Sequence, residues 1–357
     1  MFKAVCNATY PYLASFLCFV IGLLSLQASA APSQAEDIRT KLMNPSSSEV
    51  LVVAHRAAWE NAPENSLLAI QHAIYMGVDI VEIDIQRTKD GEMILMHDKT
   101  LNRTTNGKGK VADNTWTELQ SLRLRQGLGR VKRNGQAVNT ELTNEAIPHL
   151  RDALALSKGK ILVNLDKADK FMAEAFVLAR EMGVARQVIL KGKKGHNAAV
   201  LDLKQGEQEF EGIYMPKYNF RAPKKGKRKG KNTIQKTRLN INNNAQTATD
   251  ITLNYLNSSG SVKDWYAGIE DSPMAEMKFS SLEQPQVQPK VLKALTQKHR
   301  FWVNTLKVSH SADFTDSRAL HKPDSVWGEL INMGYSVIQT DEPSALLDYL
   351  RKLERHD

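Results

Sequence analysis

The segment IVEIDI, residues 80–85, decides the fold class of this chain. Successive side chains of a β-strand point to opposite faces, so Glu82 and Asp84 share one face while three β-branched residues share the other. Two carboxylates on a buried face repel each other and lose hydration, and a bound cation offsets both costs. Hard oxygen ligands suit Mg²⁺ or Ca²⁺. A solvated acidic edge strand is the competing interpretation, and the β-branched face argues against it.

Apolar, β-branched runs recur on both sides of this strand, with helical segments between them. They cover residues 50–54, 161–165, 188–190, 212–215, 265–269, 301–304 and 337–339. Eight strands in alternation with helices predict an α/β fold, a (β/α)8 TIM barrel, over residues 48–353. Residues 93–96 follow an Asp-Gly turn and predict a hairpin excursion after the second strand. Asn65 or Ser66 is placed to cap the first helix.

Two stretches interrupt this alternation. Residues 99–145 lack periodicity and are rich in Gly, Asn and Thr, which is typical of a functional loop or a boundary. Residues 219–249 are Lys-rich and then Asn-rich, which predicts a flexible basic insertion.

The net charge of the chain comes from this insertion. The chain carries +9, and nine basic residues and no acidic one lie between positions 221 and 238, so the remainder is close to neutral. The run lacks interleaved aromatic residues, and we therefore expect no nucleic-acid partner. A solvated loop is one interpretation of the run, and attraction to an anionic membrane surface is the other.

The N-terminus predicts a secretory signal peptide over residues 1–30. A lysine at position 3, an apolar stretch over residues 13–26 and Ala-Ser-Ala at 28–30 are typical of such a peptide. We expect an exported protein, periplasmic or secreted, with an uncleaved anchor as the alternative. Both cysteines, Cys6 and Cys18, lie in this segment. Cleavage would exclude disulfides, thiolate catalysis and cysteine-bound zinc from the mature chain.

Two histidines lie where barrel enzymes place their chemistry. His55, next to Arg56, follows the first strand, and His97 ends the excursion strand. Active sites of such barrels lie at the carboxyl ends of the strands. An imidazole transfers protons near neutral pH, and a guanidinium holds phosphate oxygens. A lone histidine at a strand end is more often structural, but this set suits acid–base chemistry on a phosphate ester.

These residues belong to an ordered series of short motifs. The series is HR at 55–56, PENS at 63–66, VEID at 81–84, TKDG at 88–91, HD at 97–98, LNRTT at 101–105, IPHL at 147–150 and TDEP at 340–343. In this order and spacing they resemble the glycerophosphodiester phosphodiesterase family, most densely between residues 55 and 105.

The resemblance implies hydrolysis of a small-molecule glycerophosphodiester to glycerol phosphate and an alcohol. A neighbouring glycerol hydroxyl would attack phosphorus, and the resulting cyclic phosphate would then be hydrolysed. One alternative is a phospholipase that acts on lysophospholipids or phosphoinositides. The other is a non-catalytic exported module that binds polyanions, against which the intact histidines and carboxylates argue.

The resemblance also implies which residues carry the reaction. His55 and His97 would act as base and acid. Glu82 and Asp84 would hold a divalent cation, Ca²⁺ or Mg²⁺, with Asp166 as the third carboxylate where the family usually has Glu.

Further residues would support these groups. Arg56 would bind the substrate phosphate, and Glu64 and Asn65 would orient the site. Trp302 either lines the glycerol site or belongs to the core.

The chain departs from the family pattern at two further places. Ala57 stands where the family usually has Gly, so a left-handed conformation there would be costly. The family's lysine after the third carboxylate falls on Ala168. Lys167 should face away unless the strand has ended, and Lys191, after the next strand, is the candidate to supply the missing phosphate-binding charge.

Overall fold

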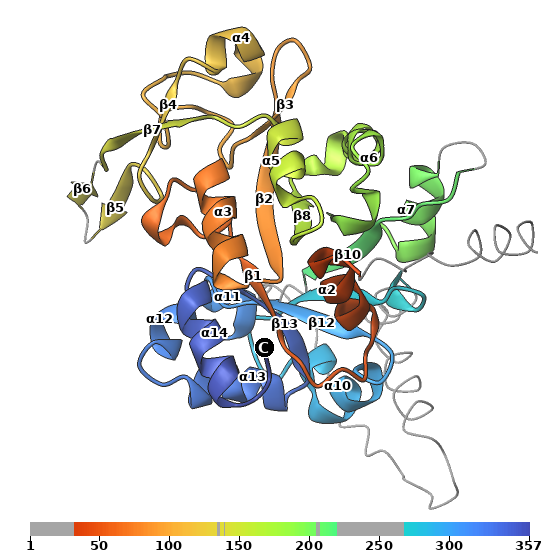
Figure 1. The fold of residues 1–357 in the computed structure, drawn as a ribbon. Coiled ribbons are helices and arrows are strands. Elements are labelled where there is room, and N and C mark those ends of the chain that lie inside the picture. Colours follow the sequence, from red (N-terminus) through yellow and green to blue (C-terminus); the bar gives the residue numbers. More distant parts are fainter. Residues whose placement is uncertain (1–31, 134–135, 139, 205–207, 220–267) are drawn as a thin grey trace, which may run out of the picture. The chain divides into compact units, whose positions relative to one another are not determined.

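The structure is a computed structural model, shown in Figure 1. It describes residues 32–133, 136–138, 140–204, 208–219 and 268–357. The predicted signal peptide, the basic run 221–238 and nearly all of the insertion 219–249 lie outside the described residues, so export and membrane attraction stay predictions. Within the described ranges, no helix has both the length and the apolar character needed to cross a bilayer.

Eight parallel strands close into a barrel, which confirms the predicted (β/α)8 fold. In hydrogen-bonded order they are β1 (Leu51–Ala54), β2 (Ile80–Arg87), β8 (Leu162–Asp166), β9 (Val188–Gly192), β10 (Ile213–Asn219), β11 (Met274–Lys278), β12 (Arg300–Asn304) and β13 (Tyr335–Thr340). Strand β1 pairs with both β2 and β13, and this double pairing closes the ring.

Helices in the connections cover the outside of the barrel (Figure 1). They are α3 (Leu67–Met76), α5 (Leu150–Ser157), α6 (Met172–Glu181), α7 (His196–Leu203), α10 (Pro289–Leu295), α11 (Val308–Ser311), α12 (Asp316–Ala319), α13 (Glu329–Asn332) and α14 (Pro343–Lys352). Ser66 caps α3 by accepting a hydrogen bond from the amide of Ala69 at 3.0 Å. The outward β-branched side chains of β2 pack in the same apolar core as these helices.

The sixth strand does not lie where the sequence predicted it. We expected it at residues 265–269, but it is β11, and Gly268 and Ile269 are helical. The prediction was wrong because β11 is built from Met, Ala, Glu and Lys, which have weak strand preference, whereas the upstream run contains Trp, Tyr and Ile. The corrected register places Glu276 beside Trp302 on the neighbouring strand.

The interior of the barrel changes from apolar at one end to charged at the other. Ile80 and Leu162, at the amino ends of β2 and β8, belong to the inner apolar cluster. Two and four residues further along β2, the same inward face carries Glu82 and Asp84. Strand β8 likewise ends on Asp166. The alternation of the strands therefore collects the charged groups at the carboxyl mouth.

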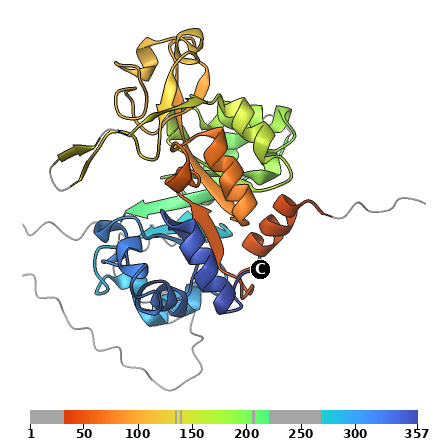
Figure 2. The ribbon, with the colours of Figure 1, turned by 60° about the vertical axis from the view of Figure 1, so that its left-hand side comes forward.

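Helix α2 (Gln34–Met43) closes the apolar end and lies before the predicted start of the barrel at residue 48. Its buried residues Ala35, Ile38 and Leu42 belong to the inner cluster. Lys41 Nζ lies 2.7 Å from Asp357 Oδ2, and Figures 1 and 2 both show α2 beside the C terminus. Both ends of the described chain thus meet at this end of the barrel.

The hairpin excursion is confirmed, since β3 (Met93–Leu95) pairs antiparallel with the end of β2. The aperiodic segment after it forms α4 (Trp116–Leu119), β4 (Arg123–Arg125), β5 (Val131–Arg133), β6 (Gln136–Val138) and β7 (Leu142–Ala146). Helix α4 and strand β4 contribute Leu119 and Leu124 to a small apolar cluster that also contains Ile94 and Leu101. In Figure 1 this part stands beyond the carboxyl end of β2, so it holds the loop after β3 near the mouth.

Replacing Leu42 with Ala should destabilise the protein by about 2–5 kcal/mol, because it leaves a cavity in the closed end of the barrel. Chemical denaturation followed by circular dichroism measures the change. Tyr75→Ala on α3 is the control, since Tyr75 is 93% exposed and a surface change of this kind costs about 0.5 kcal/mol or less. Equal losses in the two variants would contradict the role assigned to α2.

Candidate active site

Three carboxylates meet at the mouth of the barrel. Glu82, Asp84 and Asp166 each offer a ligand oxygen, and these oxygens lie within 4.8 Å of one another. Asp84 and Asp166 are direct partners across β2 and β8. Burial and the neighbouring charge of Asp84 raise the pKa of Glu82 to about 7. Such a set fits a divalent cation with a preference for oxygen, because the ion would relieve the repulsion that the pKa of Glu82 reflects.

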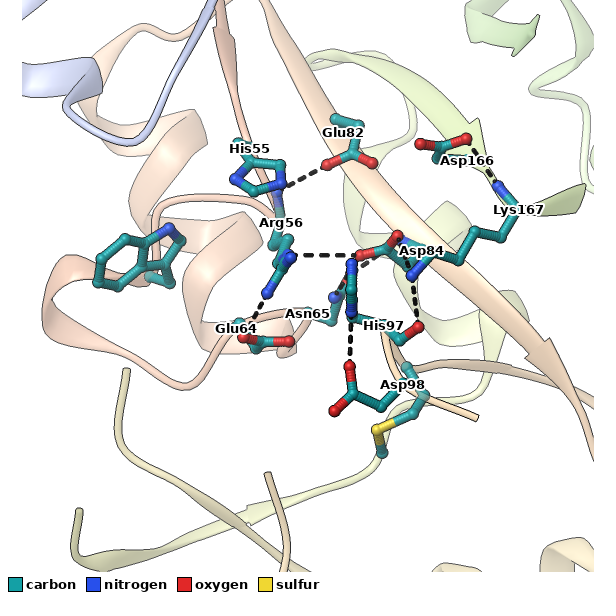
Figure 3. A network of polar contacts seen from close by, with 12 residues as sticks. His55, Arg56, Glu64, Asn65, Glu82, Asp84, His97, Asp98, Asp166 and Lys167 are labelled. Carbon is teal, nitrogen blue, oxygen red and sulfur yellow. Dashed lines mark hydrogen bonds and ion pairs between the residues drawn. The ribbon is translucent and has the colours of Figure 1, made fainter. Parts of the chain in front are cut away.

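Each of the two histidines is oriented by a carboxylate. His55 Nδ1 lies 2.7 Å from Asp341 Oδ1, and His97 Nδ1 lies 2.6 Å from Asp98 Oδ1. A carboxylate at Nδ1 fixes the ring and leaves Nε2 for the substrate. Figure 3 shows His55 beside Glu82 and His97 beside Asp84. The roles of Asp98 and Asp341 were missed, although both belong to motifs that the sequence shows.

Asp341 also sets the protonation of His55. Burial alone would lower the pKa of His55, but the hydrogen bond to Asp341 and the charge of Glu82 raise it above its usual value. Asp341 accepts a second hydrogen bond from Trp59 Nε1 at 3.0 Å. Burial disfavours the Asp341 carboxylate, yet the interaction with His55 lowers its pKa overall.

Left-handed backbone at three residues shapes the first loop. Arg56, Ala57 and Asn65 have φ values of 55°, 61° and 57°. Ala57 therefore takes the conformation that its Cβ disfavours, at a cost of about 1 kcal/mol. The turn directs the amide of Arg56 to Glu82 Oε2 at 2.9 Å. Asn65 fixes Asp84 twice, since its Nδ2 donates to Oδ2 at 3.0 Å and its Oδ1 accepts from the Asp84 amide at 2.9 Å.

Arginine and glutamate side chains form the support beneath this loop. Arg56 Nη1 donates to Glu64 Oε2 at 2.9 Å, and Arg56 Nε lies 3.7 Å from Asp84 Oδ2. Arg103 binds both Glu64 oxygens at 2.7 Å and donates from Nε to Asp98 Oδ2 at 2.7 Å. Buried Glu64 thereby links the two loops that carry the histidines. Arg103 is a further residue whose role was missed, and its place in the LNRTT motif was the available signal.

Lys167 turns into the site because β8 ends at Asp166. Its φ is 62°, and this left-handed turn reverses the direction that continued strand structure would impose. Lys167 Nζ lies 3.2 Å from Asp84 Oδ1 and also donates to the backbone carbonyl of His97. We expected Lys167 to face away from the site unless the strand had ended, and in the structure the strand ends and the side chain points into the site.

Lys191 lies deeper in the barrel. Its Nζ is 3.3 Å from Asp166 Oδ2 and 3.7 Å from Glu276 Oε2, and the side chain is buried. Burial would lower the pKa of Lys191, but Glu276 and Asp166 raise it above its usual value. Lys191 is therefore a charged neighbour of the carboxylates. Glu276 was missed because its strand was misplaced.

The sequence left open whether Trp302 lines the glycerol site or belongs to the core, and the structure places it in the core. It is fully buried in the inner cluster, so it presents no surface to a substrate. Its Nε1 donates to Asn304 Oδ1 at 2.7 Å and to Gln339 Oε1 at 3.1 Å. Asn304 in turn donates to Glu276 Oε1 at 2.6 Å. Trp302 supports the polar groups above it.

The carboxylates, histidines and Arg56 that meet at this mouth lie largely in one matched segment. Residues 55–204 match the Glycerophosphoryl diester phosphodiesterase family. The match covers less than half of the chain, and this segment is similar to the family. A second match, over residues 251–350, is to a domain of unknown function.

Relatives of this phosphodiesterase family share short segments with the chain. The glycerophosphodiester phosphodiesterase of Caldanaerobacter subterraneus is 37% identical over 119 residues, which cover 33% of this chain and 45% of the relative. That of Bacillus subtilis is 40% identical over 104 residues, 29% of this chain and 34% of the relative. The human glycerophosphodiester phosphodiesterase 1 is 39% identical over 110 residues, 30% of each chain. The chain thus matches less than half the length of these relatives.

Solved structures share the fold of this chain over a longer range. A glycerophosphoryl diester phosphodiesterase from Parabacteroides distasonis has a TM-score of 0.59 and 20% identity, covering 90% of this chain and 93% of that chain. A phosphodiesterase from Oleispira antarctica, solved in complex with the product sn-glycerol-3-phosphate, has a TM-score of 0.53 and 18% identity, covering 85% and 97%. At these identities the likeness shows a common barrel fold.

Replacing Asp341 with Asn should lower the pKa of His55, because the variant removes the negative charge that stabilises the imidazolium. NMR titration of the histidine ring resonances in the metal-free protein measures the shift. Asp348→Asn on the exposed face of α14 is the matched control and should leave the titration unchanged. An unchanged or raised pKa in Asp341→Asn would show that Asp341 does not set the protonation of His55.

Proposed function

We propose that the protein hydrolyses glycerophosphodiesters to a glycerol phosphate and an alcohol. The observation that carries the proposal is the pair of imidazoles beside one group of buried carboxylates, each imidazole bound at Nδ1 by its own carboxylate. The names of the relatives and the product bound in the Oleispira antarctica structure support this substrate class.

The histidines move the protons of the reaction. One imidazole takes a proton from the attacking hydroxyl as its oxygen bonds to phosphorus, and the other gives a proton to the alcohol oxygen as its bond to phosphorus breaks. Attack by the glycerol hydroxyl leaves a cyclic phosphate, and one water then opens it to glycerol phosphate, so one water is consumed overall and no oxidant or reductant takes part. Asp341 and Asp98 hold Nδ1 of the two rings, so Nε2 of each ring is left for these transfers. We assign the base to His55 and the acid to His97.

Glu82, Asp84 and Asp166 would hold a divalent cation, Ca²⁺ or Mg²⁺. Bound there, the ion would polarise the phosphoryl group and would lower the pKa of an attacking hydroxyl. Arg56 adds a guanidinium whose direction Glu64 sets, so it can grip phosphate oxygens. Lys167 brings a further ammonium group, which is partly exposed at the same mouth.

The charged mouth favours a water-soluble diester over an intact lipid. Lys167, Lys217 and Lys278 are partly exposed there, and each lies near a carboxylate. An acyl chain would have to desolvate these charges, whereas a deacylated diester is attracted to them. We therefore place hydrolysis of deacylated diesters ahead of the phospholipase alternative. A module that only binds polyanions would not need two carboxylate-oriented imidazoles.

His97→Ala should reduce kcat for glycerophosphocholine by at least about 100-fold, because the leaving alcohol loses its proton donor. Release of glycerol phosphate in a coupled assay measures the rate, and circular dichroism checks the fold. His321→Ala, at an exposed histidine before α13, is the matched control and should keep the wild-type rate. A wild-type protein that hydrolyses none of a panel of glycerophosphodiesters would overturn the proposed function.

Cation binding should weaken as the pH falls through about 7, because Glu82 must lose its proton to act as a ligand. Calorimetric titration of the metal-free protein with CaCl2 and with MgCl2 at pH 8 and pH 6 measures the affinity. Asp84→Asn should bind the ion at least about 10-fold more weakly at pH 8, since a charged ligand is lost. Full hydrolytic activity after chelation would contradict the assigned role of the cation.

A further inference from the structure

Two lysines line the side of the mouth that lies across the barrel from β1 and His55. Lys217 on β10 follows the inward residues Ile213 and Met215 in alternation, and Lys278 on β11 follows inward Met274 in the same way. Their side chains are 23% and 26% exposed, so both can meet a ligand in the mouth. We propose that Lys217 and Lys278 bind a second anionic group of the substrate, carried by the alcohol that hydrolysis releases. This inference rests on the proposed function.

The register places the two lysines at diagonal positions on neighbouring strands. Lys217 is the direct partner of Glu276 across β10 and β11. Lys278 lies two residues beyond Glu276 and therefore on the same face of the sheet. Long lysine side chains at such diagonal positions can reach one phosphate-sized anion.

The charges on this side of the mouth are unevenly shared. Lys278 Nζ lies 3.2 Å from Glu276 Oε1, and Lys217 Nζ lies 3.7 Å from Asp166 Oδ1. Both carboxylates also pair with buried Lys191. Three ammonium groups thus share two buried or half-buried carboxylates. Asp169, 3.6 Å from Lys217, is 48% exposed, so water screens its contribution.

A cation at the carboxylate group would sharpen this imbalance. Asp166 belongs to the proposed cation site, and its negative charge would then be neutralised by the ion. The positive charge of Lys217 would then lose most of the compensation that Asp166 provides, and it would lie next to the positive charge of the ion. An anionic group on the substrate restores the balance. On the histidine side, Arg56 and Lys167 are available to bind the scissile phosphate. Lys217 and Lys278 can therefore bind another anion.

An unpartnered imidazole lies near Lys278. Within the described residues, His310 Nδ1 on α11 is buried and has no hydrogen-bond partner. Burial and the charges of Lys278 and Lys307 lower the pKa of His310 to about 4, so the ring is neutral. A neutral ring next to these lysines can donate one hydrogen bond to an anion or to a hydroxyl beside it. Lys307, which forms no ion pair within the described part of the chain, adds a further positive charge near His310.

A matched pair of diesters tests the subsite. Glycerophosphoinositol and glycerophosphoinositol 4-phosphate differ by one phosphate on the alcohol. We expect the phosphorylated diester to have a KM at least about 10-fold lower, since charge-assisted hydrogen bonds to two ammonium groups are among the strong ones. Lys278→Gln should reduce this preference at least about 5-fold, whereas Lys293→Gln, on the exposed face of α10, should keep it.

Equilibrium binding separates this inference from the proposed function. Calorimetric titration of His97→Ala with each diester, with and without Lys278→Gln, should show the same preference without turnover. If the wild-type protein hydrolyses neither diester but the phosphorylated one still binds more tightly, the proposed function alone is overturned. Hydrolysis of both with equal KM and equal affinity would overturn the second-anion subsite alone. Equal weakening of both ligands by Lys278→Gln would also overturn it, because that result assigns the lysine to the scissile phosphate.

Discussion

The need to stabilise buried carboxylates governs the rest of this structure. A buried carboxylate without compensation takes up a proton, and the raised pKa of Glu82 shows that tendency. Lys167, His97 and Arg56 counter the same burial at Asp84 and lower its pKa. Asp166 keeps its charge beside Lys191, whose charge and that of Lys217 lower its pKa despite burial. Each of these basic side chains compensates the charge of a carboxylate next to it.

Short departures from regular backbone structure position these basic residues. Strand β8 stops at Asp166, and the left-handed Lys167 then points back over Asp84. The left-handed pair after β1 aims the Arg56 amide at Glu82. In both cases a small conformational cost is offset by a charge or a hydrogen bond in the site. The rigid barrel supplies the strand ends, and the first residues of each loop supply the chemistry.

The two parts of the chain match different family models, one of a phosphodiesterase family and one of a domain of unknown function. The phosphodiesterase match covers residues 55–204, which hold both histidines and the three carboxylates. Glu276, Lys278 and Asp341 lie beyond it, in the range that matches a domain of unknown function. Yet Asp341 orients His55, and Glu276 pairs with Lys191, so the two halves form one site. Features that distinguish this chain from its relatives are therefore to be sought on β10 and β11.

Local patterns in the sequence determined the barrel, the shared face of Glu82 and Asp84, and the places of His55 and His97, because strand alternation and motif order are properties of neighbouring residues. Only the tertiary structure decided the partners: Asp341 for His55, Glu276 for Lys191 and Asp84 for Lys167. All three pairs join residues far apart in the chain, and the pair of Asp84 and Lys167 also depends on where β8 stops. Barrel closure and register set such distances, and no local pattern encodes them. The sixth strand was misplaced for the same reason, since its weak strand formers are held extended by pairing with β10 and β12.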